Sequence, residues 1–249
     1  MQPVTKQRLD KLLVTRGLAG SRERARALIM SGTVVVNDHT VDKAGTLVAC
    51  DADVRLKGTD LPYVSRGGLK LAKALSVFDV DVKHRIAIDV GASTGGFTDC
   101  LLQHGAARVF AIDVGYGQLA WTLREDPRVV SLERTNIKDL KPDQLSEKPN
   151  LAVVDVSFIS LEKVLPSVLI LLADRADILG LIKPQFEVGR GQVGKGGVVR
   201  DPVMHENVTQ RISDFAEELS CEVCGIVESP VLGPKGNREF LIHLRKGQS

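Results

Sequence analysis

Four polar side chains follow successive apolar stretches of the chain, and their types and spacing indicate chemistry. Asp89 closes "IAID", Asp113 closes "FAID", Asn136 closes "VVSLERTN" and Asp155 closes "AVVD". Parallel strands that alternate with helices bring their carboxyl ends to one edge of a sheet, where ligands bind. Carboxylate and amide oxygens there accept hydrogen bonds from hydroxyl and ammonium groups. The sequence therefore predicts a site for a polar ligand at this edge.

A glycine-rich turn, "GASTGGF" over residues 91–97, follows the first of these strands. The dinucleotide fingerprint G-x-G-x-x-G needs a second glycine where a pyrophosphate approaches the backbone, and Ser93 stands there instead. A later stretch, "GRGQVGKGG" over 189–197, is similar to a phosphate loop at Gly194 and Lys195. Because Gly196 replaces the Ser or Thr that would bind magnesium, we expect a mobile loop there.

S-Adenosylmethionine suits the pattern better, because its ribose and carboxypropyl tail need a tight turn with open backbone groups. We expect Asp89 to face the methionine end and Asp113 to accept hydrogen bonds from the ribose diol. Tyr116 and Trp121 are candidates to stack on adenine, and core packing is the alternative for Trp121. The predicted cofactor-binding residues are Asp89, Gly91, Ala92, Ser93, Gly95, Gly96, Phe97, Asp113, Val114, Asn136 and Asp155.

Strands and helices that alternate along the chain must position these residues. We expect strands near 85–90, 108–114, 128–132, 150–156, 177–183, 222–231 and 239–244, and helices near 67–78, 95–104, 117–124, 160–173 and 202–219. This order predicts an α/β fold, a Rossmann-like, seven-stranded, mostly parallel sheet. The last two strands should pair antiparallel, because the turn-rich "LGPKGNR" between them has no room for a helix.

Residues 1–60 differ in pattern and predict a small α+β domain, followed by a linker at 61–66 and the larger domain at 67–249. Two short amphipathic helices precede a hairpin that turns at Asn37 and Asp38. Basic residues dominate the first thirty positions, where only Asp10 and Glu23 oppose them. A local excess of this kind is typical of a nucleic-acid-binding face, with a solvated helix surface as the alternative.

Composition excludes several other classes. The net charge of +2 does not by itself indicate nucleic acid, and the N-terminus has no apolar leader. The apolar stretch "VLPSVLILLA" is too short for a membrane span, so we expect a cytoplasmic protein with no membrane partner. Cys221 and Cys224 have zinc-ligand spacing, but no second pair completes a site, so no metal is expected. No pattern indicates an oligomeric state.

Several long motifs make the chain resemble the TlyA family, also called the haemolysin A family, of bacterial rRNA methyltransferases. They are "SRGGLKL", "DVGASTGGFTD", "DVGYGQLAWTLR", "LERTN", "DVSFISL", "KPQFEVGRGQVGKGGVVRDP" and "GPKGNREF". The N-terminal part resembles a small RNA-binding domain of ribosomal-protein type, except that Cys50 precedes Asp51 where that domain usually has glycine. The C-terminal part resembles the FtsJ-type 2′-O-ribose methyltransferases of class I.

The resemblance implies methyl transfer from S-adenosylmethionine to a cytidine ribose of ribosomal RNA, with ribosomal subunits as the partner. It also implies a catalytic set of Lys70, Asp155, Lys183 and Glu239. We expect Lys183 nearest the hydroxyl, with Asp155 and Glu239 orienting it; either lysine is a candidate to take the proton. The expected RNA-binding residues are Arg8, Lys11, Arg22, Arg24, Arg26, Arg66, Arg190 and Lys195.

Three rival functions share parts of this pattern. An exocyclic-amine methyltransferase carries [DN]-P-P-[YF] after the fourth strand, whereas this chain has "DVSF". A membrane-lytic protein, suggested by the haemolysin name, would need a spanning segment or a strong basic amphipathic helix. A pseudouridine synthase can carry the same N-terminal domain but needs no cofactor turn. Ribose methylation therefore accounts for more of the sequence than any of the three.

Overall fold

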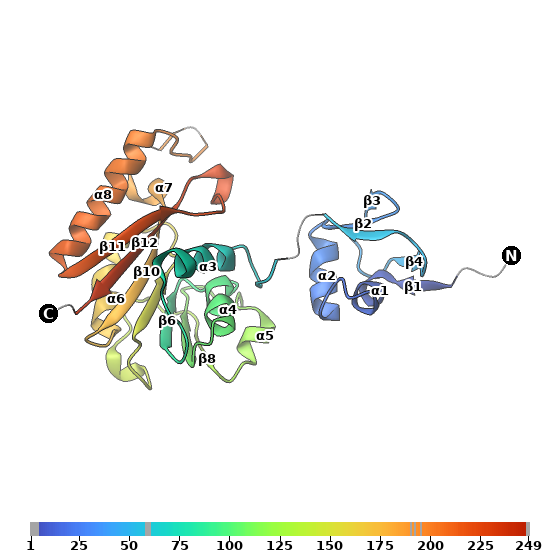
Figure 1. Ribbon diagram of the computed structural model, residues 1–249, viewed down its shortest axis with the longest axis horizontal. Coiled ribbons are helices and arrows are strands. Elements are labelled where there is room, and N and C mark those ends of the chain that lie inside the picture. Colours follow the sequence, from blue (N-terminus) through green and yellow to red (C-terminus); the bar gives the residue numbers. More distant parts are fainter. Residues whose placement is uncertain (1–4, 58–60, 190, 192, 195, 248–249) are drawn as a thin grey trace. The chain divides into compact units, whose positions relative to one another are not determined.

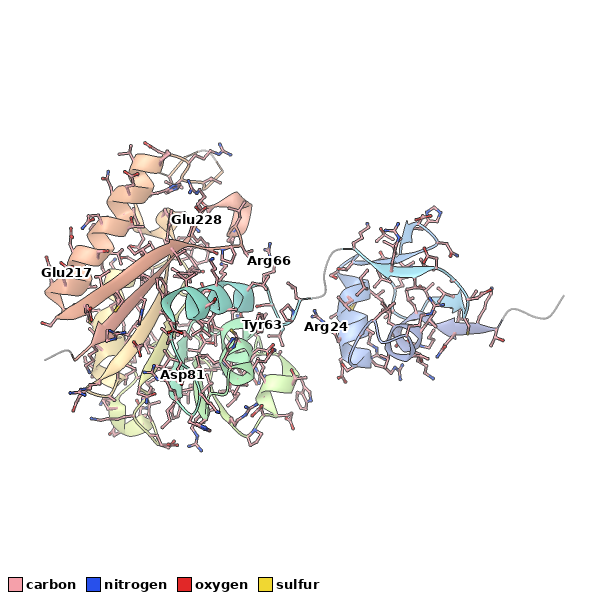
Figure 2. The ribbon with its side chains drawn as sticks, in the orientation of Figure 1. Arg24, Tyr63, Arg66, Asp81, Glu217 and Glu228 are labelled. Carbon is pink, nitrogen blue, oxygen red and sulfur yellow. The ribbon has the colours of Figure 1, made fainter. Side chains whose placement is uncertain are left out.

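A computed structural model describes residues 5–57, 61–189, 191, 193–194 and 196–247. The chain divides into two compact units, Met1–Leu61 and Pro62–Ser249 (Figure 1). Residues 62–66, which the sequence pattern assigns to a linker, belong to the second unit. Tyr63, which is labelled in Figure 2, is buried there. Its ring occupies the space beside Gly68, where a β-carbon would lie 2.2 Å from the ring.

The first unit packs two helices on short strands. Ser21 caps the second helix by accepting a hydrogen bond from the Arg24 amide, and Asn37 and Asp38 turn the hairpin with positive φ. Two further strands, β1 (Lys6–Arg8) and β4 (Leu47–Ala49), pair with each other antiparallel, and the sequence pattern did not predict them. The elements are β1 (Lys6–Arg8), α1 (Leu9–Thr15), α2 (Arg22–Met30), β2 (Val34–Val36), β3 (His39–Thr40), β4 (Leu47–Ala49) and β5 (Val54–Leu56).

The second unit contains a seven-stranded sheet, which confirms the predicted Rossmann-like class. Its order is β11-β12-β10-β9-β6-β7-β8, and β12 pairs antiparallel with both β10 and β11. The remaining neighbours pair in parallel. The strands are β6 (Ile86–Val90), β7 (Arg108–Ile112), β8 (Val129–Leu132), β9 (Leu151–Val154), β10 (Ala176–Ile182), β11 (Cys221–Glu228) and β12 (Phe240–Lys246).

Helices cover both faces of this sheet (Figure 1). One core cluster joins α6 and α8 to the sheet, and a second joins α3, α4 and α5 to its other face. The expected helix over 160–173 is divided: Ser160 caps a 3-10 turn, and α6 begins afterwards with Pro166 in its first turn, where no N–H is needed. The helices are α3 (Gly67–Phe78), α4 (Gly96–Gln103), α5 (Trp121–Arg124), α6 (Leu165–Leu171), α7 (Pro184–Glu187) and α8 (Pro202–Glu218).

The strand order reverses between β6 and β9, which lie side by side at the centre of the sheet. From β6 the chain proceeds outward through β7 to β8, whereas β9 is followed by β10 on the other side. The carboxyl ends of β6 and β9 therefore flank the topological switch point, where ligands bind in sheets of this class. Within the described residues, no helix is long and apolar enough to cross a membrane.

Candidate active site

The glycine-rich turn after β6 has the close backbone approach that its composition predicts. Gly91 has φ +88°, and a β-carbon there would lie 2.6 Å from the Asp155 carbonyl oxygen. Gly95 has φ +94° and is the N-cap residue that precedes α4. A β-carbon on Gly96 would lie 2.2 Å from the Ser65 hydroxyl oxygen, so the turn also packs on the segment before α3. Larger side chains at these glycines would push the turn away from both neighbours.

Two adjoining cavities open at the switch point. The apolar cavity, about 470 Å³, follows β6, β7 and β9 and is lined by Val90, Gly91, Ser93, Ile112, Asp113, Val114, Gln118, Thr135, Asn136, Ile137, Asp155, Val156, Ser157, Phe158, Ile159 and Val164. The charged cavity, about 280 Å³, is lined by Ser65, Arg66, Gly67, Lys70, Gly91, Ala92, Ser93, Thr94, Gly96, Phe97, Asp155, Lys183, Val231, Leu232, Gly233, Pro234 and Glu239. Gly91, Ser93 and Asp155 line both cavities, so Asp155 lies at their junction.

The charged cavity brings together the four residues of the expected catalytic set, in two ion pairs. Lys183 Nζ lies 2.5 Å from Asp155 Oδ1 and donates a hydrogen bond to Ser157 Oγ at 3.0 Å. Lys70 Nζ lies 2.5 Å from Glu239 Oε2. Lys70, Lys183 and Glu239 are buried, and Asp155 is partly exposed. The expectation that Glu239 orients Lys183 is therefore wrong, because Glu239 holds Lys70.

Buried neighbours fix the Glu239 carboxylate. A β-carbon on Gly233 would lie 2.0 Å from Glu239 Oε1, so the backbone of that loop packs directly on the carboxylate. Asn237, 2% exposed, accepts a hydrogen bond from the Val199 amide and donates to the Gly197 and Pro234 carbonyls. These bonds connect the loop before Glu239 to the end of the glycine-rich stretch over 189–197.

Asp89 differs from its predicted role, because it lines neither cavity. It is fully buried within β6, and its Oδ2 accepts a hydrogen bond from Thr98 Oγ1 of α4 at 2.6 Å. Burial raises the pKa of this carboxyl to about 7. Its Oδ1 has no hydrogen-bond partner within the described residues. Asp89 therefore joins α4 to the sheet from beneath the turn.

The rim of the apolar cavity contains Asp113 and Asn136, as expected, and several residues that the sequence pattern does not reveal. Asp113 accepts hydrogen bonds from the Ser93 and Gly115 amides, both at 2.7 Å, so the carboxylate and the turn hold each other. Tyr116 and Trp121, the candidates for adenine stacking, are exposed and do not line the cavity; Trp121 is also outside the core. The polar and aromatic residues missed at this cavity are Gln118, Thr135, Ser157 and Phe158.

The residues expected to bind RNA lie in both units. Arg8, Arg22 and Arg26 pair with one buried carboxylate, Asp10, and Lys11 is exposed. Arg24 donates a hydrogen bond to the Leu61 carbonyl. Arg66, labelled in Figure 2, is exposed at the start of α3. It also lines the charged cavity. Arg190 and Lys195 lie outside the described residues, so the expected RNA contacts and mobility of that loop stay a prediction.

Comparison with known proteins agrees with the division of the chain into two units. The FtsJ-like methyltransferase model matches residues 63–246, and the S4 domain model matches residues 7–53. A candidate rRNA methyltransferase of Bacillus subtilis is 52% identical over 96% of this chain and 85% of its own length. The 16S/23S rRNA (cytidine-2′-O)-methyltransferase TlyA of Mycobacterium tuberculosis is 48% identical over 96% of this chain and 89% of its own length. The chain belongs to the TlyA family.

A solved structure supports the membership in the TlyA family. A candidate hemolysin from Streptococcus thermophilus has a TM-score of 0.77 and 46% identity, covering 99% of this chain and 90% of that one. The family implies S-adenosylmethionine as co-substrate, an S4 domain that binds RNA, and the methyltransferase sheet described above. Of the ligands considered from the sequence, S-adenosylmethionine is the one that the family implies.

Proposed function

We propose that this chain transfers the methyl group of S-adenosylmethionine to the 2′-hydroxyl of a cytidine in ribosomal RNA. One observation carries the proposal: Asp155, which lines both cavities, holds Lys183 at their junction. A cofactor in one cavity and a ribose in the other would meet at that ion pair. The rRNA (cytidine-2′-O)-methyltransferase named among the relatives supplies the substrate class.

The residues present suit S-adenosylmethionine. Gly91, Ala92, Ser93, Thr94 and Gly96 of the turn line the charged cavity, where their backbone groups can approach a ligand. Asp113 accepts hydrogen bonds from the Ser93 amide of this turn and from the Gly115 amide, and retains lone pairs for a ribose diol. Ile112, Val114, Ile137 and Ile159 give the apolar cavity the walls that an adenine ring needs. When bound, the cofactor supplies an electrophilic methyl group on a positively charged sulfur.

Lys183 is suited to act on the attacking hydroxyl. A ribose hydroxyl is a weak acid that must lose its proton as its oxygen attacks carbon. A buried lysine amino group at that point stabilises the developing negative charge when it is protonated, or takes the proton when it is neutral. Asp155 and Ser157 limit the Lys183 side chain to one direction, toward the junction. Fixing the hydroxyl in line with the methyl group then provides much of the rate enhancement.

Lys70 and Glu239 make the second, more deeply buried pair. Glu239 pairs with Lys70 as Asp155 pairs with Lys183, so these four charges of the cavity balance one another. Arg66 and the open start of α3 line the same cavity, where positive charge favours a phosphate next to the target ribose. We assign to this pair the positioning of the nucleotide, and to Lys183 the contact with the hydroxyl.

The test incubates the full chain with S-adenosylmethionine labelled in its methyl group and with 30S or 50S ribosomal subunits lacking the modification. Digestion and mass spectrometry of the nucleosides should place the label on the ribose of cytidine. Subunits carrying a 2′-deoxy nucleotide at the mapped position should accept no label there. Label on the base, or no label on either subunit, would overturn the proposed function.

A further inference from the structure

Asp10 is a fully buried carboxylate in the first turn of α1, and three guanidinium groups surround it. Arg8 donates to it from Nε and Nη2, at 3.0 Å to each carboxylate oxygen. Arg22 Nη2 lies 3.0 Å and Arg26 Nε 3.4 Å from the same Oδ2. Composition alone indicates that these arginines are exposed cations with few acidic partners. The structure shows instead that all three pair with the same carboxylate, Asp10.

The three side chains are held and yet accessible. Those of Arg8, Arg22 and Arg26 are 42%, 47% and 51% exposed, whereas Asp10 is 0% exposed. A guanidinium group has five N–H donors, and within the described residues Asp10 takes two from Arg8 and one from each of the others. Each arginine therefore keeps donors for an external acceptor while its position is set from beneath.

We propose that Asp10 is a positioning residue that fixes Arg8, Arg22 and Arg26 as one receptor for the phosphate backbone of RNA. The cluster has three positive charges and one negative charge, so it stays attractive to anions. Guanidinium groups fixed in advance lose less entropy when they bind a phosphate, at roughly 0.5–1.5 kcal/mol, or about two- to tenfold in affinity, per side chain. The inference rests on the proposed function, because the RNA that this cluster would bind is the substrate of the proposed methyl transfer.

Simple electrostatics predicts the opposite result for removal of the acid. Asp10→Asn takes a negative charge from a basic face, so unspecific attraction alone would strengthen RNA binding. If Asp10 positions the arginines, the variant should instead bind about fivefold more weakly or worse. It should also show a shallower salt dependence, because an arginine that no longer meets its phosphate lowers the slope by roughly one.

The experiment compares full-length Asp10→Asn with Asp38→Asn, which removes the same charge from an exposed pair. Arg55 Nη2 lies 2.8 Å from Asp38 Oδ1, and both side chains are mostly exposed. Fluorescence anisotropy with a labelled rRNA hairpin, over a series of salt concentrations, gives the affinity and the slope. Asp38→Asn should bind as tightly as wild type or more tightly. Binding by folded Asp10→Asn that equals or exceeds that of Asp38→Asn would overturn the proposal.

A second pair of variants decides the question if Asp10→Asn does not fold. Arg8→Lys keeps the charge but gives up the two-pronged hydrogen bonding to Asp10, so it should weaken RNA binding, whereas Arg55→Lys should not. Equal affinities for the two would also overturn the proposal. The methyl-transfer assay of the wild-type chain is independent of both comparisons. If wild type methylates subunits while these variants bind normally, only the inference about Asp10 fails.

Discussion

The Nζ atom of Lys70 lies 2.5 Å from Oε2 of Glu239, although 169 residues separate the two in the chain. The first stands in α3 and the second just before β12, so the pair joins two ends of the methyltransferase unit. Lys183 and Asp155 form a second pair in the same cavity. Each of the two pairs joins one positive and one negative charge. Replacing one member of a pair by a neutral residue therefore leaves the charge of its buried partner uncompensated.

Glu239→Gln should therefore destabilise the protein by about 3 kcal/mol and lower the rate of methyl transfer. The double variant Lys70→Met with Glu239→Gln removes both charges and should recover most of the missing stability. It should not recover activity, if the pair positions the nucleotide. Urea denaturation gives the free energy of unfolding, and single-turnover transfer gives the rate. Recovery of both would mean that the pair is only structural.

Lys183→Ala should abolish methyl transfer and leave the affinity for S-adenosylmethionine nearly unchanged. Its proposed contact is with the hydroxyl in the transition state, so the loss should fall on turnover. Lys163→Ala, at an exposed lysine that lines neither cavity, is the control. Turnover above about a tenth of wild type would remove Lys183 from the catalytic set.

Cofactor affinity should depend on the turn and on Asp113. In Gly91→Val the β-carbon would lie 2.6 Å from the Asp155 carbonyl oxygen, in a backbone conformation that valine avoids. Asp113→Ala removes the acceptor of the Ser93 and Gly115 amides together with the proposed acceptor of the ribose diol. Calorimetry should show weaker binding for both and wild-type binding for Asp143→Ala, an exposed acid that lines neither cavity. Unchanged affinity in both variants would argue against this placement of the cofactor.

The alternation of apolar strands and helices predicted the sheet, its antiparallel end and the edge at which the site lies. The prediction succeeded because the spacing of apolar residues and the types of residue at turns can be read from short stretches of sequence. Asp113, Asn136 and Asp155 were predicted for the same reason, since each follows a strand. The predicted role of Asp89 in the cofactor site was wrong, because the pattern does not show that its side chain is covered by α4 and bonded to Thr98.

Pairing between distant residues was the harder part. Without the resemblance to a family, Lys70 would be an ordinary helix lysine, and the sequence does not show that it meets Glu239. Asp10 was counted as one acid among many bases, whereas its burial makes it the anchor of three of them. Gln118 and Phe158 carry no local signal, because only the folded rim brings them to the cavity.

Stability should fall as the pH rises from about 4 to about 7, because of Asp89. Burial raises the pKa of this carboxyl from 3.8 to about 7, so over that range the folded protein keeps a proton that the unfolded chain releases. The unfolded state binds fewer protons, and the slope can reach about 1.4 kcal/mol per pH unit. Asp89→Asn stays neutral and keeps an acceptor for Thr98. The difference in unfolding free energy between variant and wild type, measured at pH 5, 6 and 7, should grow with pH; a constant difference would contradict the assignment.

A truncated chain of residues 62–249 should bind S-adenosylmethionine about as well as the full chain and lose most activity on ribosomal subunits. All residues of both cavities lie after Leu61, while the Asp10 cluster lies before it. Phosphate contacts supply affinity and register, so a chain without them should encounter its target site rarely. The starting residue matters, because Tyr63 packs on Gly68 and Ser65 on Gly96, so a chain beginning at Gly67 should also lose cofactor affinity. Calorimetry and subunit methylation on both truncations separate the two effects. If residues 62–249 methylate subunits at the full-length rate, the S4 domain is not the RNA anchor.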